Sequence, residues 1–186
     1  KEIKLIKDSK SPLIADVKPK EDYLATEKKV AISAKVKDQN PIWIYVNGQA
    51  VAKDETSFKK QLTLSDGKQQ VKIKVVDAAG NKTEYLRNLV VDTTAPKAFE
   101  LSSKPTGWTN NNQPVISFST TDQTSGISHY ELAIDNGEFN KVESPYKLPA
   151  LEDGEHQIKV KAVDNAGWER VAKTKVLIDT TAPKQP

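Results

Sequence analysis

The sequence of 186 residues contains no cysteine and no methionine. Without cysteine the chain can form neither a disulfide nor a thiolate site for metal or redox chemistry, so apolar cores must stabilise it. Without methionine it lacks an initiating residue, and we expect it to be an excised piece of a longer chain. Arginine is scarce as well, since only Arg87 and Arg170 occur among 28 basic residues. This bias towards lysine is typical of low-GC bacterial genes.

Long hydrophobic runs are also missing. No stretch approaches the roughly 20 apolar residues of a membrane-spanning helix, and no signal peptide is recognisable. The formal net charge is only +3, with 18 basic and 13 acidic side chains in residues 1–96 and 10 and 12 in residues 97–186. Such mild charges do not indicate a nucleic-acid binder. We therefore expect no nucleic-acid partner and no membrane insertion.

What the sequence does contain is a repeat of itself. The segment VDTTAPK (91–97) returns as IDTTAPK (178–184), 87 residues later. When residues 64–97 are placed over 151–184 at the same offset, 16 of 34 positions are identical. Self-similarity at a fixed spacing indicates tandem modules.

A weaker third copy, IKLIKDSKSP (3–12), stands at the N-terminus, where Asp8 precedes Asp92 by 84 residues. Modules of this size that are joined by the same short segment form a tandem array. We therefore divide the chain into residues 1–9, the tail of an upstream module or an extra first strand; 10–96, the first module; and 97–186, the second module, which ends in the joint to a further one.

The strands are recognisable from alternation with a period of two. VKIKV (71–75) and IKVKA (158–162) place apolar groups on one face and lysines on the other. Turn pairs such as Asn47-Gly48 and Asp153-Gly154 supply the positive φ that hairpins need. No window carries a helical stripe. About seven short strands per module predict an all-β protein of two tandem immunoglobulin-like Greek-key β-sandwiches.

The joint itself is short and semi-stiff. Pro96 and Pro183 lack an N–H and bias the preceding alanine towards extended geometry. Thr93 and Thr94 favour the same geometry as β-branched residues. Such a joint limits bending, unlike a Gly/Ser tether.

At these residues the chain resembles a known family. VDAAGNKTEYLRNLVVDTTAP (76–96) and AVDNAGWERVAKTKVLIDTTAP (162–183) resemble the last two strands of bacterial Ig-like domains. The first module is similar to the Ig-like module found beside glucodextranase-type and other secreted enzymes. The second, with GWTNNNQPVISFSTTDQTSGISHYELAIDNGEF (107–139), resembles the kind found in large bacterial surface proteins. Trp168 departs from the pattern, because the first module has Asn81 there.

The resemblance implies an extracellular or cell-wall-associated bacterial protein in which such modules serve as spacers, adhesins or accessory domains of hydrolases and proteases. The only histidines, His129 and His156, fall in no nucleophile or metal motif. We therefore expect no enzymatic activity in this region, although the parent protein can be an extracellular enzyme.

Aromatic side chains are the candidate binding residues. Trp43 and Tyr45 alternate with apolar residues on one strand, and we favour a partly buried, structural Trp43, as on the third strand of an immunoglobulin-type sandwich. If Ile42, Ile44 and Val46 face the core instead, the two rings form an exposed strip able to stack on sugars or protein. We expect Trp108 to cover one end of the second module, with a ligand platform as the alternative. Trp168 is expected to be the more exposed, on a turn.

Calcium is the one cofactor for which the sequence offers candidates. Asp77 and Asp164 open equivalent turns, and Asp92 and Asp179 stand in the two joints. Calcium requires six to eight oxygen ligands, and no EF-hand spacing is present. We favour Asx turns over a calcium site for these aspartates.

The sequence thus favours a non-catalytic tandem spacer that sets the distance and orientation of neighbouring domains in the same polypeptide. Two alternatives stay open: a module that binds polysaccharide or a host or matrix protein, and an accessory module of an extracellular hydrolase or protease.

Overall fold

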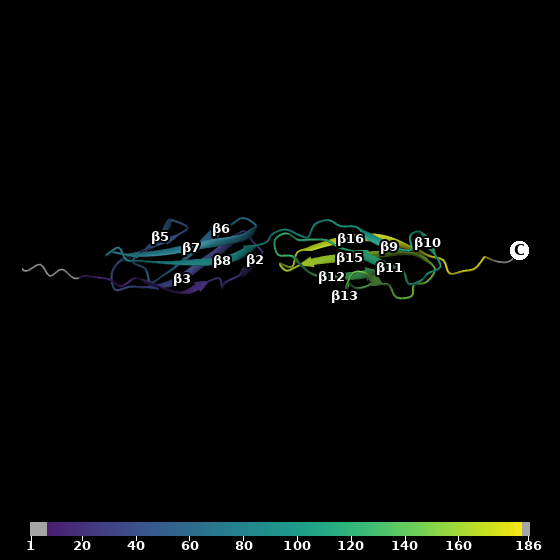
Figure 1. Cartoon of the computed structure of the whole chain (residues 1–186), viewed down its shortest axis with the longest axis horizontal. Helices are drawn as coiled ribbons and strands as arrows, with labels where there is room; N and C mark the ends of the chain where they lie inside the picture. The colour runs from purple at the N-terminus through teal and green to yellow at the C-terminus, as the bar shows by residue number, and fades with distance from the viewer. Residues whose placement is uncertain (1–6, 184–186) are drawn as a thin grey trace, which may run out of the picture. The chain divides into compact units, whose positions relative to one another are not determined.

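The structure, a computed structural model, describes residues 7–183. The chain divides into two compact units, Lys1–Thr93 and Thr94–Pro186. Each unit consists of two β-sheets packed face to face, and the described residues contain no helix (Figure 1). Accordingly, no described helix could cross a membrane. The prediction of an all-β protein with two sandwiches is confirmed.

The first unit pairs a three-stranded sheet with a five-stranded one. The smaller sheet has the order β1 (Leu13–Lys18), β3 (Lys29–Lys37), β6 (Ser57–Thr63). The larger sheet has the order β2 (Tyr23–Ala25), β8 (Lys82–Val91), β7 (Gly67–Asp77), β4 (Ile42–Val46), β5 (Gln49–Lys53).

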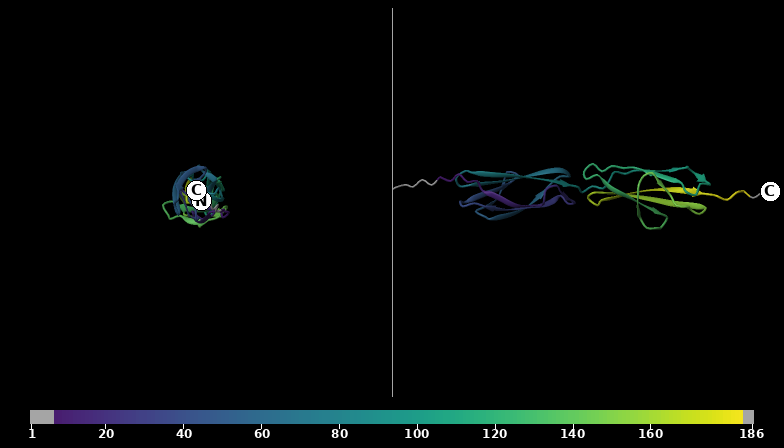
Figure 2. Two further views of the ribbon diagram at one scale, coloured as in Figure 1. Left: turned by 90° about the vertical axis from the view of Figure 1, so that its left-hand side faces the viewer. Right: turned by 60° about the horizontal axis from the view of Figure 1, so that its bottom comes forward.

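The second unit repeats this topology strand for strand. Its smaller sheet has the order β9 (Leu101–Lys104), β11 (Val115–Phe118), β14 (Tyr146–Lys147). Its larger sheet has the order β10 (Trp108–Thr109), β16 (Glu169–Ile178), β15 (Gly154–Asp164), β12 (Ile127–Ile134), β13 (Asn140–Val142). The two layers of each unit can be followed in a second orientation in Figure 2.

Among residues 7–183, each unit has eight strands rather than about seven, because the chain changes sheets near the start of each unit. In the first unit β1 pairs antiparallel with β3, and β2 then pairs parallel with β8. Pro19 lies between them and has no N–H with which to continue the ladder of β1. Residues 7–12 form no strand, and the remainder of the N-terminal part for which an extra strand was considered lies outside the described residues.

The alternation read from the sequence fixes the cores. Val71, Ile73 and Val75 of β7 are fully buried, as are their counterparts Ile158, Val160 and Ala162 of β15. The intervening lysines face outward, as expected for sheets with one face on a core and one in water. Asn47 and Gly48, between β4 and β5, both have positive φ (48° and 80°), which confirms the predicted hairpin turn.

The cores differ in how they fill equivalent space. In the first unit Ile44 of β4 lies opposite Val75. In the second unit the corresponding pair is Tyr130 of β12 and Ala162. A larger side chain on one strand is thus matched by a smaller one on its neighbour, which keeps the packed volume nearly constant.

Candidate functional site

Trp43 and Tyr45 lie on the outer face of the first unit. Ile42, Ile44 and Val46 of β4 are buried, with at most 5% of each residue exposed, so the two rings between them point away from the core. Trp43 is partly buried, as favoured, but the strand has the orientation of the alternative, with Trp43 and Tyr45 on the outer face. Neither ring is fully exposed, since both residues are of intermediate burial.

Lysines accompany both rings on this outer face. The Nζ of Lys53 lies 5.2 Å from the centroid of the Trp43 ring, and the Nζ of Lys74 lies 5.9 Å from that of Tyr45. These are cation–π distances. The register places His129 and Glu131 at the corresponding positions of the second unit. The aromatic strip is thus a property of the first unit alone.

The other two tryptophans reverse their expected order of exposure. Trp108 is 64% exposed on the two-residue edge strand β10, so the expectation that it covers an end of the module is wrong. Trp168 is 39% exposed in the turn before β16, where its backbone N–H donates to Asp164 Oδ1 at 2.8 Å. The structure does not bring Trp43, Trp108 and Trp168 into one site within either unit.

The beginning of each joint is held by an aspartate of the same unit. In the first unit Asp66 Oδ1 accepts hydrogen bonds from the backbone N–H of Thr93 at 2.9 Å and from its Oγ1 at 2.8 Å. In the second unit Asp153 Oδ1 accepts the equivalent bonds from Thr180 at 2.8 and 2.7 Å. We call this pair of contacts the exit clamp. The spacing from aspartate to threonine is 27 residues in both units.

The clamp aspartates are favoured in their ionised form. Hydrogen bonding from Thr93 lowers the pKa of Asp66, and hydrogen bonding from Thr180 and Thr181 lowers the pKa of Asp153. Lys28 also lies 3.1 Å from Asp66. Hydrogen bonds donated to a carboxylate stabilise its charged form, so both clamps are intact at neutral pH.

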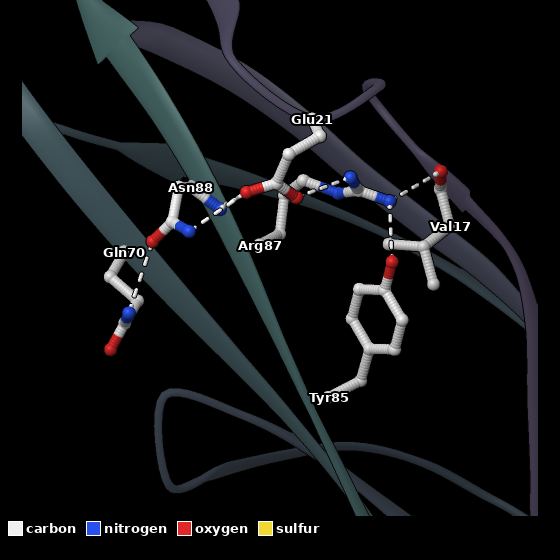
Figure 3. A network of polar contacts seen from close by, with 6 residues as sticks. All are labelled: Val17, Glu21, Gln70, Tyr85, Arg87 and Asn88. Carbon is white, nitrogen blue, oxygen red and sulfur yellow. Dashed lines mark hydrogen bonds and ion pairs between the residues drawn. The ribbon is translucent and has the colours of Figure 1, made fainter.

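A buried arginine holds the strand that leads into the first clamp (Figure 3). Arg87 of β8 is 6% exposed; its Nη1 lies 2.6 Å from Glu21 Oε2, and its Nη2 donates to the Tyr85 hydroxyl at 3.0 Å and to the Val17 carbonyl at 3.3 Å. Asn88 donates to the other oxygen of Glu21 at 2.8 Å. The network ties the segment between β1 and β2 to β8. In the sequence, Arg87 is conspicuous only as one of two arginines.

The calcium candidates take part in turns. Asp77 Oδ1 accepts from the N–H groups of Ala79 and Asn81, at 2.9 and 2.8 Å. Burial acts to raise the pKa of Asp77, but hydrogen bonds from Asn81 and from neighbouring backbone outweigh it and lower the pKa. Asp164 accepts from Ala166 and Trp168 in the same way. The favoured Asx turns are therefore present.

Two acidic residues that are not among the calcium candidates from the sequence, Asp8 and Asp38, lie beside Asp77. One carboxylate oxygen each of Asp8, Asp38 and Asp77 falls within 4.8 Å of the others. In the second unit Asp122 and Asp164 are within the same distance. Asp38 precedes Asp122 by 84 residues, the spacing that also separates Asp8 from Asp92. The repeat therefore marks Asp38 and Asp122 as equivalent residues.

The joint aspartates themselves are positioned by their backbones. The N–H of Asp92 donates to the Ala25 carbonyl at 2.8 Å, and that of Asp179 donates to the Thr109 carbonyl at 2.9 Å. Asp179 also accepts from the Thr181 N–H at 3.1 Å. Calcium binding at any of the four candidates stays a prediction.

The histidines occupy ordinary structural positions. His156 Nδ1 lies 2.9 Å from Asp135 Oδ2, and its Nε2 lies 3.0 Å from the Glu152 carbonyl. His129 contacts Ser128 and Glu131, at 3.2 and 3.3 Å. Neither serine nor carboxylate is arranged there as a nucleophile with a general base and an orienting third group.

Comparison with known proteins supports the family assignment of the first unit. Residues 13–93 match the family model for glucodextranase, domain B. This confirms the resemblance of the first unit to the Ig-like modules found beside glucodextranase-type enzymes. No curated protein matches the chain.

Among solved structures, the fibronectin(III)-like modules of Clostridium thermocellum CbhA are 18% identical, cover 94% of this chain and 98% of theirs, and have a TM-score of 0.39. SGBP-B of the Bacteroides ovatus mixed-linkage glucan utilization locus, in complex with a heptasaccharide, is 17% identical over 92% of this chain and 48% of its own, with a TM-score of 0.35. A structure from a 1.5-MDa bacterial ice-binding adhesin is 14% identical, covers 94% of this chain and 67% of its own, and has a TM-score of 0.48. These likenesses concern the fold and say nothing of what this chain binds.

Proposed function

We propose that this region is a non-catalytic tandem Ig-like spacer of an extracellular or cell-wall-associated bacterial protein, and that it sets the distance and orientation of neighbouring domains. The observation that carries the proposal is the exit clamp. Asp66 and Asp153 hold the first threonine of each joint in the same way, through its backbone N–H and its hydroxyl.

The clamp acts by removing conformational freedom. Thr93 is the last residue of the first unit, and two hydrogen bonds fix it to the loop that precedes β7. Because ordering one residue costs about 1–2 kcal/mol of backbone entropy, a joint that is already ordered has fewer directions to explore. Pro96 has a fixed φ and restricts Ala95, the residue before it, to extended geometry. The chain therefore leaves the module in a defined direction.

Distance measurements between the modules test the proposal. The chain has no cysteine, so spin labels attached to Lys59→Cys and Lys173→Cys, both exposed positions, would be the only labels present. We expect a narrow distance distribution by double electron–electron resonance. Asp66→Ala should broaden it, because the first joint loses its clamp.

Asp153→Ala is the matched control. It removes the identical clamp after the second module and leaves the labelled joint untouched, so the distribution should not change. A broad distribution in the unsubstituted chain, or one that Asp66→Ala leaves unaltered, would contradict a spacer of limited flexibility.

The second candidate function is binding to a polysaccharide or to a host or matrix protein. The outward orientation of Trp43 and Tyr45 favours it, because aromatic rings on an open sheet face offer large contact area at low entropic cost. Trp43→Ala would abolish binding to such a partner while costing the core nothing. Trp108→Ala and Trp168→Ala extend the test to the other exposed rings. If the parent chain carries a hydrolase or protease domain, the same surface would serve as its accessory module.

A further inference from the structure

The second module differs from the first at the edge of its smaller sheet. In the first module β6 pairs with β3 through seven successive residue pairs, from Lys29↔Thr63 to Lys35↔Ser57. In the second, β14 pairs with β11 at two residues only, Val115↔Lys147 and Ile116↔Tyr146. The edge of β11 beyond Ile116 is therefore not covered by a strand.

A side chain replaces the missing backbone pairing. Continuing the register of β11 and β14 places Ser144 opposite Phe118, and Ser144 Oγ accepts the Phe118 N–H at 2.9 Å. The corresponding position of the first module holds Phe58, which lies opposite Ala34 and is 7% exposed. The second module thus has a small hydroxyl where the first fills the edge with a phenyl ring.

A hollow of about 1070 Å³ lies at this uncovered edge, between β11 and the paired strands β12 and β13. Its volume lies just above the range of about 300–1,000 Å³ typical of small-ligand sites, which leaves room for several sugar rings. It lies wholly within the second module. None of the aromatic residues selected from the sequence lines it.

The floor of the hollow is aromatic and fixed in place. Tyr130 packs against Phe118 with ring centroids 5.0 Å apart, and its hydroxyl accepts the Thr120 N–H at 3.0 Å. Phe99 also packs on Tyr130, edge to face, with ring centroids 6.4 Å apart. Tyr146 adds a third ring to the lining, beside those of Phe118 and Tyr130. A floor held by packing and hydrogen bonds needs little reorganisation when a ligand binds.

The rim is polar and carries both signs of charge. Lys141 and Glu143 line it together with Ser119, Ser128 and His129. Across residues 7–183, neither Lys141 nor Glu143 has a side-chain hydrogen bond or ion pair. An anionic polymer would meet Glu143 and a cationic one Lys141, whereas a neutral ligand rich in hydroxyl groups can use both as hydrogen-bond partners.

We propose that this groove binds a segment of a neutral polysaccharide, with the apolar faces of sugar rings on Tyr130 and Tyr146 and their hydroxyl groups on Glu143, Lys141 and the rim serines. Pyranose rings combine apolar faces with equatorial hydroxyls, which is the pattern that the floor and rim complement. The site is independent of the spacer role and of the aromatic strip of the first module.

The test is a titration of the ¹⁵N-labelled 186-residue chain with cellohexaose, xylohexaose and laminarihexaose, followed by amide shifts. At least one of them should cause saturable shifts in residues 117–120, 127–130 and 141–146, and none around Trp43. Glu143→Gln should weaken the binding about tenfold, because the sugar hydroxyls then donate to a neutral amide oxygen instead of a charged carboxylate. Glu143 is exposed, so the substitution leaves the fold intact.

Glu100→Gln serves as the matched control, since Glu100 is an exposed glutamate of the same module outside the hollow. Its binding should equal that of the unsubstituted chain. The proposal is overturned if no neutral hexasaccharide gives saturable shifts at these residues up to millimolar concentration, or if Glu143→Gln binds undiminished. It is equally overturned if polygalacturonate or an unstructured peptide, and no neutral sugar, perturbs the groove. None of these outcomes would change the result of the distance measurements, so the spacer proposal is tested separately.

Discussion

The two modules share one topology but not one surface. Their similarity is concentrated in β7–β8 and β15–β16 with the joint that follows, where 16 of 34 aligned residues are identical. These segments supply the fully buried centre of each core and the exit clamp. The strands at the sheet edges differ in length and content, as β6 and β14 show. Core and exit direction thus constrain the sequence, while the edges can acquire separate properties.

The largest expected effect tests how each module fills its edge. Phe58→Ala should destabilise the first module by about 3–5 kcal/mol, because a buried ring at the β3–β6 edge is replaced by a cavity. Ser144→Ala, at the corresponding position of the second module, removes one hydrogen bond and should cost about 1 kcal/mol. Amide hydrogen exchange resolves the two modules in one sample.

A double substitution sharpens this comparison. Ala34→Phe with Phe58→Ser moves the ring to the neighbouring strand, as in the second module, and should recover part of the stability that Phe58→Ala loses. No recovery would mean that the two edges are not equivalent in packing.

The next effect concerns the exchanged core pair. Ala162→Val should destabilise the second module by about 1–3 kcal/mol. The added methyl groups would clash with the Tyr130 ring, which is larger than Ile44 at the equivalent position of the first module. Adding Tyr130→Ile should relieve the strain. A double-mutant cycle in denaturant measures the coupling, and additive effects would refute the volume match.

A pH titration should distinguish the modules by their histidines, since both lie in the second. The hydrogen bond with Asp135 raises the pKa of His156 above its usual value. A raised pKa stabilises the folded module below the unfolded pKa of about 6.5, and this contribution disappears as the pH rises through the folded pKa. Between about pH 6 and 8 the second module should therefore lose stability while the first stays constant.

His156→Gln should abolish that slope, measured by hydrogen exchange or thermal unfolding at each pH. His129→Gln should retain it. An equal slope in both modules would show that another group is responsible.

The repeat and the period-two alternation were sufficient to predict the fold, because buried strand positions leave a direct mark in the sequence. The exit clamp could also have been predicted from the repeat, because Asp66 and Asp153 precede the threonines that they bind by the same 27 residues. The face of Trp43 could not be decided, because Ile42, Trp43 and Ile44 are all suitable core residues. The groove exists because β14 pairs with β11 at two residues only. The length of this pairing depends on tertiary structure and leaves no mark in the sequence. Glu143 and Lys141 therefore looked like ordinary surface charges.

The smallest expected effect concerns calcium. If Asp77 binds the ion together with Asp8 and Asp38, added calcium should raise the melting temperature of the first module by a few degrees, because an ion that binds only the folded state stabilises it. Asp38→Asn would cancel the rise, since it removes one carboxylate while leaving the Asx turn of Asp77 intact. Magnesium is the control cation, because its octahedral geometry does not suit an irregular set of carboxylates. An unchanged melting temperature would instead assign Asp77 wholly to its turn, where its carboxylate already accepts three hydrogen bonds from Ala79 and Asn81.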